Sequence, residues 1–186
     1  MRKLVFIAIC LALVAGCGGS DDYVSDADCE ALCDKNLECN PDTNVTECVT
    51  ECEQLKQLIR GEVYDAMAAC TLDLPCESEQ IGACLEDATD LAPEGASDGL
   101  MRAMCKKQLD CSGATGEMTV SECVDQAKVQ AADYLQYFNA FKSSVLSCLS
   151  DCVSDLSCAD LQQDDFMDPC MEECGIPTGE DGGGGD

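Results

Sequence analysis

The chain has 186 residues and carries 37 Asp and Glu against 10 Lys and Arg, a formal net charge of −27 at pH 7. This acidic surplus excludes binding of nucleic acid or anionic lipid head groups through charge, because such partners are repelled. The chain also has no histidine, which excludes Ser-His-Asp and Cys-His catalysis, histidine metal centres and histidine proton shuttles.

The first element along the chain is an apolar segment that predicts export. Residues 1–3 are a short basic region, and residues 4–15 form an uncharged apolar run of twelve residues. This run is too short to span a bilayer as a permanent helix, but it has the length of a signal-peptide core. No transmembrane segment is expected after it.

The apolar run ends in the sequence LVAGC, residues 13–17. This segment resembles the lipobox of bacterial lipoproteins, in which small residues precede a cleavage site and a cysteine follows it. The resemblance implies that residues 1–16 are removed as a signal peptide and that Cys17 is lipidated, which anchors the protein in the cell envelope. Gly18, in place of Asp, implies the outer membrane by the enterobacterial sorting rule. Ordinary secretion with an unmodified Cys17 is the alternative.

A polar stretch follows the expected anchor. Residues 18–28 have the sequence GGSDDYVSDAD. Such a segment has little apolar surface to bury, so it does not gain enough from packing to become ordered. We therefore expect residues 17–28 to be a lipidated N-terminus and a flexible tether.

Sixteen cysteines remain once Cys10, in the signal peptide, and Cys17 are set aside. An even number of cysteines in an exported chain is typical of a disulfide framework that compensates for a thin core. The core here is short of aromatic volume, with no Trp, four Phe and four Tyr. Zinc ribbons need Cys-x-x-Cys pairs, whereas every close pair in this chain has three intervening residues. The spacing therefore favours disulfides over zinc.

The cysteines define four units with a common spacing. In each unit the first two positions are four residues apart, the third follows after six, and the last two are again four apart. The units are Cys29, Cys33, Cys39, Cys48 and Cys52; Ala66, Cys70, Cys76, Cys84 and Ala88; Met101, Cys105, Cys111, Cys123 and Ala127; and Cys148, Cys152, Cys158, Cys170 and Cys174. The second and third units thus lack the same two cysteines.

Similarity beyond cysteine pairs the units into two modules. ALCDKNLEC at 31–39 parallels AMCKKQLDC at 103–111, and CTLDLPC at 70–76 parallels CVSDLSC at 152–158. The third and fourth units therefore duplicate the first and second. The expected boundaries are a first helical module at 29–90, a linker at 91–99, a second helical module at 100–175 and a disordered acidic tail at 176–186.

Helical geometry predicts most of the disulfides. Cysteines four residues apart lie on one face of a helix, so two antiparallel helices can be joined by an inner and an outer bond. The second and third units lack both outer cysteines together, as expected if those positions pair. The bonds predicted in this way are Cys29–Cys52, Cys33–Cys48, Cys70–Cys84, Cys105–Cys123, Cys148–Cys174 and Cys152–Cys170.

One cysteine of each unit is left over. Pairing within modules gives Cys39–Cys76 and Cys111–Cys158, which would tie each hairpin to its neighbour. The rival pairs are Cys39–Cys111 and Cys76–Cys158. Either choice uses every remaining cysteine, so no thiol is left for catalysis.

Local signals support helices in both modules. Asn44 with Glu47, and Thr119 with Glu122, match the capping-box arrangement at helix starts. Apolar residues between Cys123 and Cys148 recur every three or four positions, which indicates helix. This stretch is 25 residues long against 18 in the first module, from Cys48 to position 66. The extra seven residues correspond to two helical turns, and Gly61 predicts a break between helices.

These inferences define an all-α fold of two tandem modules, each made of two disulfide-clasped antiparallel helical hairpins. The twin Cys-x-x-x-Cys hairpin resembles α-hairpinins and related helical-hairpin disulfide scaffolds. The resemblance implies inhibitors, toxins or binding modules, and a shared fold alone does not select among them.

For function we expect a non-catalytic, lipid-anchored envelope protein that acts as a binding or structural module. Its expected partners are the membrane, through the lipid on Cys17, and an unidentified extracytoplasmic protein, but not nucleic acid. We expect no enzyme activity, no cofactor and no catalytic or metal-ligating residue. One alternative is a calcium or other divalent-cation binder that uses two acidic groups, although neither fits EF-hand spacing. Their members are Asp21, Asp22, Asp26 and Asp28, and Asp160, Asp164, Asp165 and Asp168.

A second alternative is a protease-inhibitor-like module that presents the loop at 40–43. An apolar stripe of aromatic residues in the second module is also a candidate partner face, but we expect most of it to belong to the core, with Tyr137 outside. The stripe comprises Tyr134, Tyr137, Phe138 and Phe141.

Overall fold

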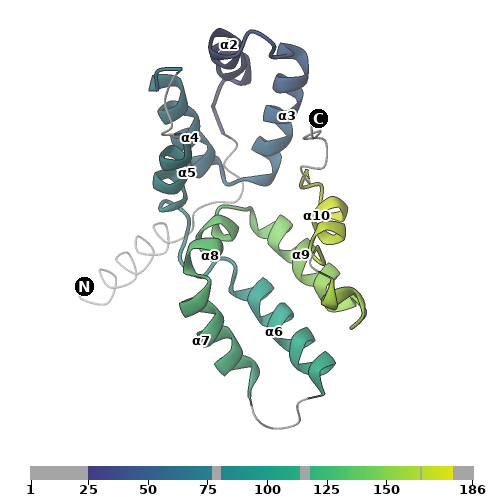
Figure 1. The fold of residues 1–186 in the computed structure, drawn as a ribbon. Coiled ribbons are helices and arrows are strands. Elements are labelled where there is room, and N and C mark those ends of the chain that lie inside the picture. The colour runs from purple at the N-terminus through teal and green to yellow at the C-terminus, as the bar shows by residue number, and fades with distance from the viewer. Residues whose placement is uncertain (1–24, 77–80, 114–117, 164, 178–186) are drawn as a thin grey trace, which may run out of the picture.

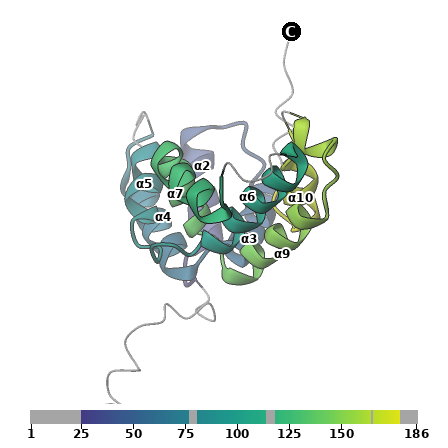
Figure 2. The same ribbon diagram turned by 90° about the horizontal axis from the view of Figure 1, so that it is seen from below.

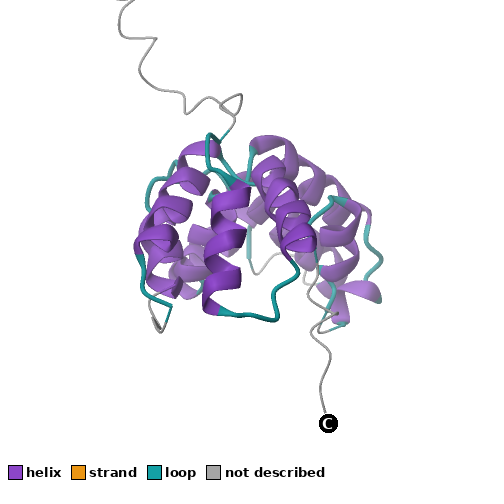
Figure 3. Cartoon of the chain, turned by 90° about the horizontal axis from the view of Figure 1, so that it is seen from above, coloured by secondary structure: helices purple, strands orange, loops and turns teal. Residues whose placement is uncertain are grey.

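A computed structural model of the chain describes residues 25–76, 81–113, 118–163 and 165–177. This part of the chain is all-α, without a strand (Figure 3). The helices are α2 (Cys29–Cys39), α3 (Val45–Leu58), α4 (Gly61–Asp73), α5 (Ile81–Thr89), α6 (Asp98–Ser112), α7 (Val120–Gln130), α8 (Ala132–Asn139), α9 (Ser143–Asp155) and α10 (Asp168–Glu173), with a short 3-10 helix, η2 (Asp160–Gln162), before α10.

The helices form two modules of two hairpins each, as the cysteine spacing predicts. Hairpins α2/α3 and α4/α5 make the first module, and α6/α7 and α9/α10 make the second, with α8 joining the two hairpins of the second module (Figure 1). Viewed from below, α4, α5 and α7 lie on one side of the molecule and α6, α9 and α10 on the other (Figure 2).

Eight disulfides hold the hairpins in the described part of the chain, and six of them are the pairs that helical spacing predicts. The six bonds within hairpins have Cα–Cα distances of 5.5–5.8 Å, an ordinary separation for a disulfide. Cys39–Cys76 and Cys111–Cys158 tie each first hairpin to the second hairpin of its module. The rival pairing between modules is therefore not the one in the structure.

The predicted helix starts at Asn44 and Thr119 are confirmed. Thr119 Oγ1 accepts a hydrogen bond from the Glu122 backbone N–H at 3.2 Å, and Glu122 Oε2 accepts from the Thr119 N–H at 2.7 Å, a complete capping box. These hydrogen bonds from Thr119 lower the pKa of the Glu122 carboxyl. Asn44 Oδ1 accepts from the Glu47 N–H at 3.4 Å. Both caps therefore satisfy backbone N–H groups that a helix leaves free at its first turn.

The seven extra residues of the second module form a separate helix rather than two more turns of α7. Helix α7 ends at Gln130, and Ala131 has φ −127° and ψ 31°, outside the helical range, before α8 begins. The resulting bend lets Phe138 pack against the core around Leu149. In the first module the chain breaks between Leu58 and Gly61, as Gly61 predicts.

The two modules meet at the short non-helical segment that precedes the second hairpin of each module. The Arg60 N–H donates to the Ala140 carbonyl and the Lys142 N–H donates to the Leu58 carbonyl, both at 2.9 Å. Ile59 and Phe141 lie opposite each other in this short antiparallel bridge. Arg60 is equivalent to Lys142, since α4 and α9 begin one residue after them and are both 13 residues long. By the same offset Leu58 is equivalent to Ala140 and Ile59 to Phe141. The two hydrogen bonds are therefore reciprocal, and the bridge itself is locally symmetric.

Two basic side chains reinforce this junction. Arg60, which is 6% exposed, donates from Nε to the Asn139 carbonyl at the end of α8, at 3.0 Å. Lys142 donates from Nζ to the Lys56 carbonyl in the last turn of α3, at 2.9 Å. Carbonyl groups at the end of a helix lack partners within the helix and carry partial negative charge. Each module therefore supplies the cation that satisfies the helix end of the other.

A missing outer disulfide makes room for the same junction. Ala66 and Ala88 stand where the outer cysteines of the second unit would be, and Ala88 is 2% exposed. Together with Val63 they pack against Ala140 of the second module. The small side chains thus allow the end of α8 to approach α4 and α5. The largest buried cluster also crosses the junction, because Leu58 packs with Leu149 and its neighbours.

Two ends of the folded part differ from the expected boundaries. Ser25, at 4% exposed, and the Ala27 N–H both donate to Asp65 Oδ1 on α4, and Lys56 Nζ donates to the Ala27 carbonyl. Residues 25–28, which the sequence assigns to the tether, are thus held against the first module. Ile176, assigned to the tail, is 9% exposed and packs on the second module. Residues 25–28 are held by hydrogen bonds to side chains distant in the sequence. Ile176 is held by apolar contacts with the core.

No helix in the described ranges combines the length and the apolar character needed to cross a membrane.

Candidate functional site

The second module contains an apolar cavity with a volume of about 490 Å³. It lies between α6, α7, α8 and α10, and we call it the methionine cavity. Its lining residues are Ser97, Leu100, Met101, Met104, Cys105, Gln108, Cys123, Ala127, Ala131, Leu135, Phe138, Met167 and Met171. Only Gln108 among them is exposed, while most of the others are half-buried. This volume and lining match those of sites for small organic ligands, which are concave, mostly apolar and edged by a few polar groups.

The methionine cavity occupies the place of an absent disulfide. Met101 and Ala127 stand at the outer cysteine positions of the third unit, and both line the cavity. In the first unit the equivalent residues, Cys29 and Cys52, are bonded to each other. Without that bond, Cys105–Cys123 is the one disulfide between α6 and α7. The outer positions of this hairpin therefore present apolar side chains to the cavity, where the first unit carries a disulfide.

The cavity concentrates the methionines of the chain. Four of the seven methionines line it, namely Met101, Met104, Met167 and Met171. A methionine side chain is unbranched and polarisable, so it adapts its shape to whatever apolar group it contacts. Met101 is 4% exposed, whereas the other three are half-buried. The lining is therefore suited to apolar groups of more than one shape.

The first module has a cavity of about 470 Å³ at the equivalent place. Leu32, Asn36 and Leu85 line it where Met104, Gln108 and Met171 line the methionine cavity. It is more polar, because Lys35, Glu51 and Thr71 also contribute. The duplication thus repeats the cavity, and the two copies differ in character.

Tyr64 closes one side of the first-module cavity. Its hydroxyl lies 3.0 Å from Cys52 Sγ and donates to the Cys52 carbonyl at 3.4 Å. Burial, followed by the nearby Glu53 carboxylate, raises the pKa of the Tyr64 phenol. The phenol therefore stays protonated at neutral pH and remains a hydrogen-bond donor.

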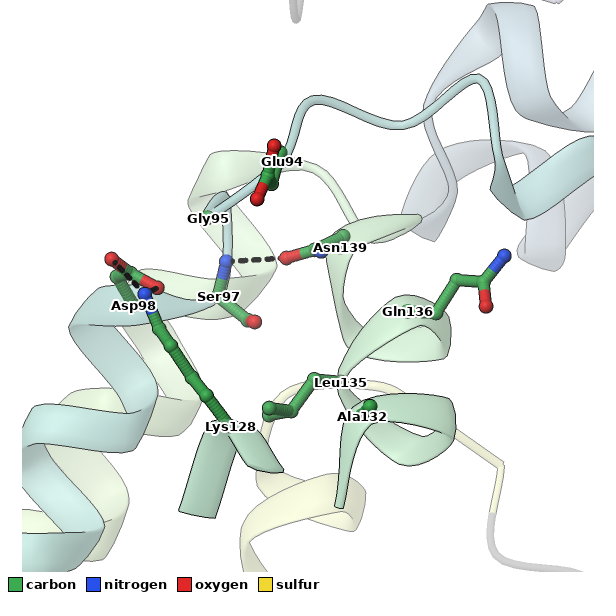
Figure 4. Close-up of a pocket in the computed structure, with 9 residues that line it drawn as sticks. All are labelled: Glu94, Gly95, Ser97, Asp98, Lys128, Ala132, Leu135, Gln136 and Asn139. Carbon is green, nitrogen blue, oxygen red and sulfur yellow. Dashed lines mark hydrogen bonds and ion pairs between the residues drawn. The ribbon is translucent and has the colours of Figure 1, made fainter. Parts of the chain in front are cut away.

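A smaller polar pocket of about 200 Å³ adjoins the methionine cavity (Figure 4). Lys128 reaches from α7 to Asp98 at the start of α6, with Nζ 2.7 Å from Oδ1. The Ser97 N–H donates to Asn139 Oδ1 at 2.8 Å. The lining residues are Glu94, Gly95, Ser97, Asp98, Lys128, Ala132, Leu135, Gln136 and Asn139.

A glycine shapes the turn at this polar pocket. Gly95 has φ +77°, a conformation that other residues rarely adopt, and its carbonyl accepts from the Asp98 N–H at 3.0 Å. This turn starts α6 and brings the Ser97 N–H to Asn139 on α8. Ser97 and Leu135 line both the polar pocket and the methionine cavity. The two spaces are therefore neighbours with a shared wall.

The described residues offer no nucleophilic thiol, because all sixteen described cysteines are in the eight disulfides. The same part of the chain has no cluster of three or more His, Cys, Asp or Glu side chains arranged to hold a metal ion. Asp28 is occupied as the N-cap of α2. Hydrogen bonds from the Ser157 side chain and backbone lower the pKa of Asp160. Asp21, Asp22 and Asp164 of the predicted acidic groups lie outside the described residues.

The other predicted candidates are spread over the molecule. Tyr137 is 43% exposed, whereas Phe138 and Phe141 are half-buried and pack against the core, as expected. The Tyr134 side chain and Cys17 lie outside what the structure describes. The loop at 40–43 is a short turn between α2 and α3, with the Thr43 N–H donating to the Asn40 carbonyl. Of the candidates that the structure describes, Phe138 alone lines the methionine cavity.

Sequence reasoning missed the cavity itself. The signal that could have found it is the paired loss of cysteine at positions 101 and 127, together with methionine at 101, 104, 167 and 171. No family model, curated protein or solved structure matches this chain.

Proposed function

We propose that this chain is a lipid-anchored protein of the bacterial cell envelope, that it is not an enzyme, and that it binds a small apolar ligand in the methionine cavity. The lipobox-like segment at 13–17 and the following Gly18 support anchoring through Cys17 at the outer membrane. The eight disulfides support an oxidising compartment, since thiols in the cytosol are kept reduced.

The observation that carries the binding proposal is the methionine cavity. Its volume of about 490 Å³ lies within the range of roughly 300–1,000 Å³ that is typical of small-molecule sites. An empty apolar cavity costs stability, because its lining atoms lose packing contacts. A protein with few aromatic residues would be more stable if such a cavity were filled by its own side chains. That the cavity is kept in a hairpin with a single disulfide supports a binding role.

An anchored chain would hold this cavity close to the membrane. The folded part is fixed at Ser25 by its contact with Asp65. Seven residues lie between Cys17 and Ser25, and extended chain spans at most about 3.6 Å per step, so the eight steps reach about 30 Å. The protein is thereby suited to take up molecules that leave or enter the bilayer.

Binding is tested with the neutral fluorescent probe N-phenyl-1-naphthylamine on the mature chain. We expect saturable fluorescence enhancement, since the probe gains intensity when it enters an apolar space. Ala127→Phe should reduce the affinity at least tenfold, because a ring at this half-buried position fills the methionine cavity. Val129→Phe is the matched control, as Val129 lies on the same helix and is 83% exposed. Equal binding by the two variants would contradict the proposal.

Anchoring is tested on the chain expressed in a bacterium with its first 16 residues present. We expect intact mass to show loss of residues 1–16, a diacylglyceryl and acyl modification on Cys17, and no free thiol among the other cysteines. A Cys17→Ser variant should leave the detergent-rich phase in a phase-partition assay, because the acyl chains are its attachment. An unmodified Cys17 in the wild-type chain would support ordinary secretion instead.

A further inference from the structure

We infer that the ligand of the methionine cavity is a single-chain amphiphile with a cationic head group, which lies in the adjoining polar pocket. This inference rests on the proposed binding function. It adds that the apolar chain of the ligand occupies the methionine cavity, that the head group occupies the polar pocket, and that the head group is positively charged.

The two spaces adjoin, one mostly apolar and the other polar, so an elongated molecule could occupy both. Ser97 and Leu135 line both, and the consecutive residues Ala131 and Ala132 line one each. Figure 4 shows the Ser97 side chain directed into the space between Asn139 and Leu135. A molecule that fills the methionine cavity and extends past Ser97 therefore enters a polar environment. An alkyl chain with a polar end has this form.

The charges at the polar end favour a cation. The pocket is lined by two carboxylates, Glu94 and Asp98, and by one ammonium, Lys128. The Lys128 ammonium already pairs with both carboxylate oxygens of Asp98, at 2.7 and 2.9 Å. Glu94 is exposed and makes no ion pair with another described residue. The head group would therefore meet an unbalanced negative charge.

The field of the whole protein acts in the same direction. The formal net charge is −27, so an anionic head group would be repelled on approach and a cationic one attracted. An ammonium also donates hydrogen bonds without accepting any, which suits the carboxylate and hydroxyl oxygens of Glu94 and Ser97. A carboxylate head would instead need donors, and Lys128, the pocket's only cation among the described residues, is occupied by Asp98.

The experiment compares three ligands that share a chain and differ in the head. Decylamine, 1-decanol and decanoate displace N-phenyl-1-naphthylamine from the mature protein at pH 7, each below its aggregation concentration. We expect decylamine to displace the probe at the lowest concentration, then decanol, then decanoate. A single charge contact near the surface supports about a fivefold preference of amine over alcohol.

Two variants separate a local contact from the general field. Glu94→Gln should remove most of the preference of amine over alcohol, whereas Asp34→Asn, which deletes the same charge from an exposed position on α2 of the first module, should leave it unchanged. Decanoate binding as tightly as decylamine, or equal effects of the two variants, would overturn the inference while leaving apolar binding intact. Failure of every ligand and of the probe itself would instead overturn the proposed function.

Discussion

A chain carrying Met101→Cys together with Ala127→Cys is expected to form a further disulfide and to be more stable than the same chain with serine at both positions. These positions match Cys29 and Cys52, which are bonded in the first module with a Cα–Cα distance of 5.7 Å. Met101 and Ala127 belong to one packed cluster around Cys105. A new bond here would fix the outer turns of α6 and α7, between which Cys105–Cys123 is now the one disulfide.

The expected gain is about 2 kcal/mol, at the lower end for a disulfide, because Cys105–Cys123 already closes most of the loop. For a chain of this size, this corresponds to a rise in melting temperature of about 4–8 °C. The matched control is Met101→Ser with Ala127→Ser, which places side chains of nearly the same size at both positions but cannot form a disulfide. Two titratable thiols in the cysteine variant, or melting no higher than in the serine control, would mean that the two positions do not face each other.

Removing the inner bond of the same hairpin, with Cys105→Ala and Cys123→Ala, is expected to have a large destabilising effect. The bond closes a loop with a sequence separation of 18, and it is the only disulfide between α6 and α7. By restricting the unfolded chain, a disulfide that closes such a loop stabilises the folded state by about 3 kcal/mol, and this stabilisation is lost in the variant. Cys105 is also 5% exposed, so its truncation removes buried contacts.

The comparison is the outer bond of the last hairpin, removed by Cys148→Ala and Cys174→Ala. Its sequence separation is larger, 26, but Cys152–Cys170 still joins α9 and α10 when it is lost. We therefore expect this pair to cost less than the Cys105–Cys123 pair, at about 2 kcal/mol. Urea unfolding monitored by circular dichroism gives both values. A larger loss for the outer bond would mean that loop length outweighs the number of bonds per hairpin.

The fold class and the six disulfides within hairpins could be predicted because they follow from local geometry, whereas the spacing alone left two pairings open for Cys39, Cys76, Cys111 and Cys158. A spacing of four fixes which cysteines share a helix face, and the joint absence at positions 66 and 88, and at 101 and 127, identifies the outer partners. The caps at Asn44 and Thr119 are likewise set within one helical turn. These features need no knowledge of how distant segments pack.

The features that sequence reasoning missed depend on distant packing. The helical periodicity from Cys123 to Cys148 does not mark the bend at Ala131, because that bend is favoured by contacts of Phe138 and Ala140 with separate clusters. The docking of Ser25 depends on Asp65, forty residues later. The methionine cavity draws residues from four helices, and only the fold brings them together.

The bridge between Ile59 and Phe141 has a consequence for how the two cavities came to differ. Equivalent segments that pair face to face are the hallmark of a symmetric dimer, in which one surface meets itself. In a dimer of identical chains every substitution occurs twice, so both halves change together. In a single polypeptide the two halves can differ, and here Cys52 forms a disulfide while its equivalent, Ala127, lines the methionine cavity. The duplicated chain therefore combines a symmetric bridge with two halves that carry different cavities.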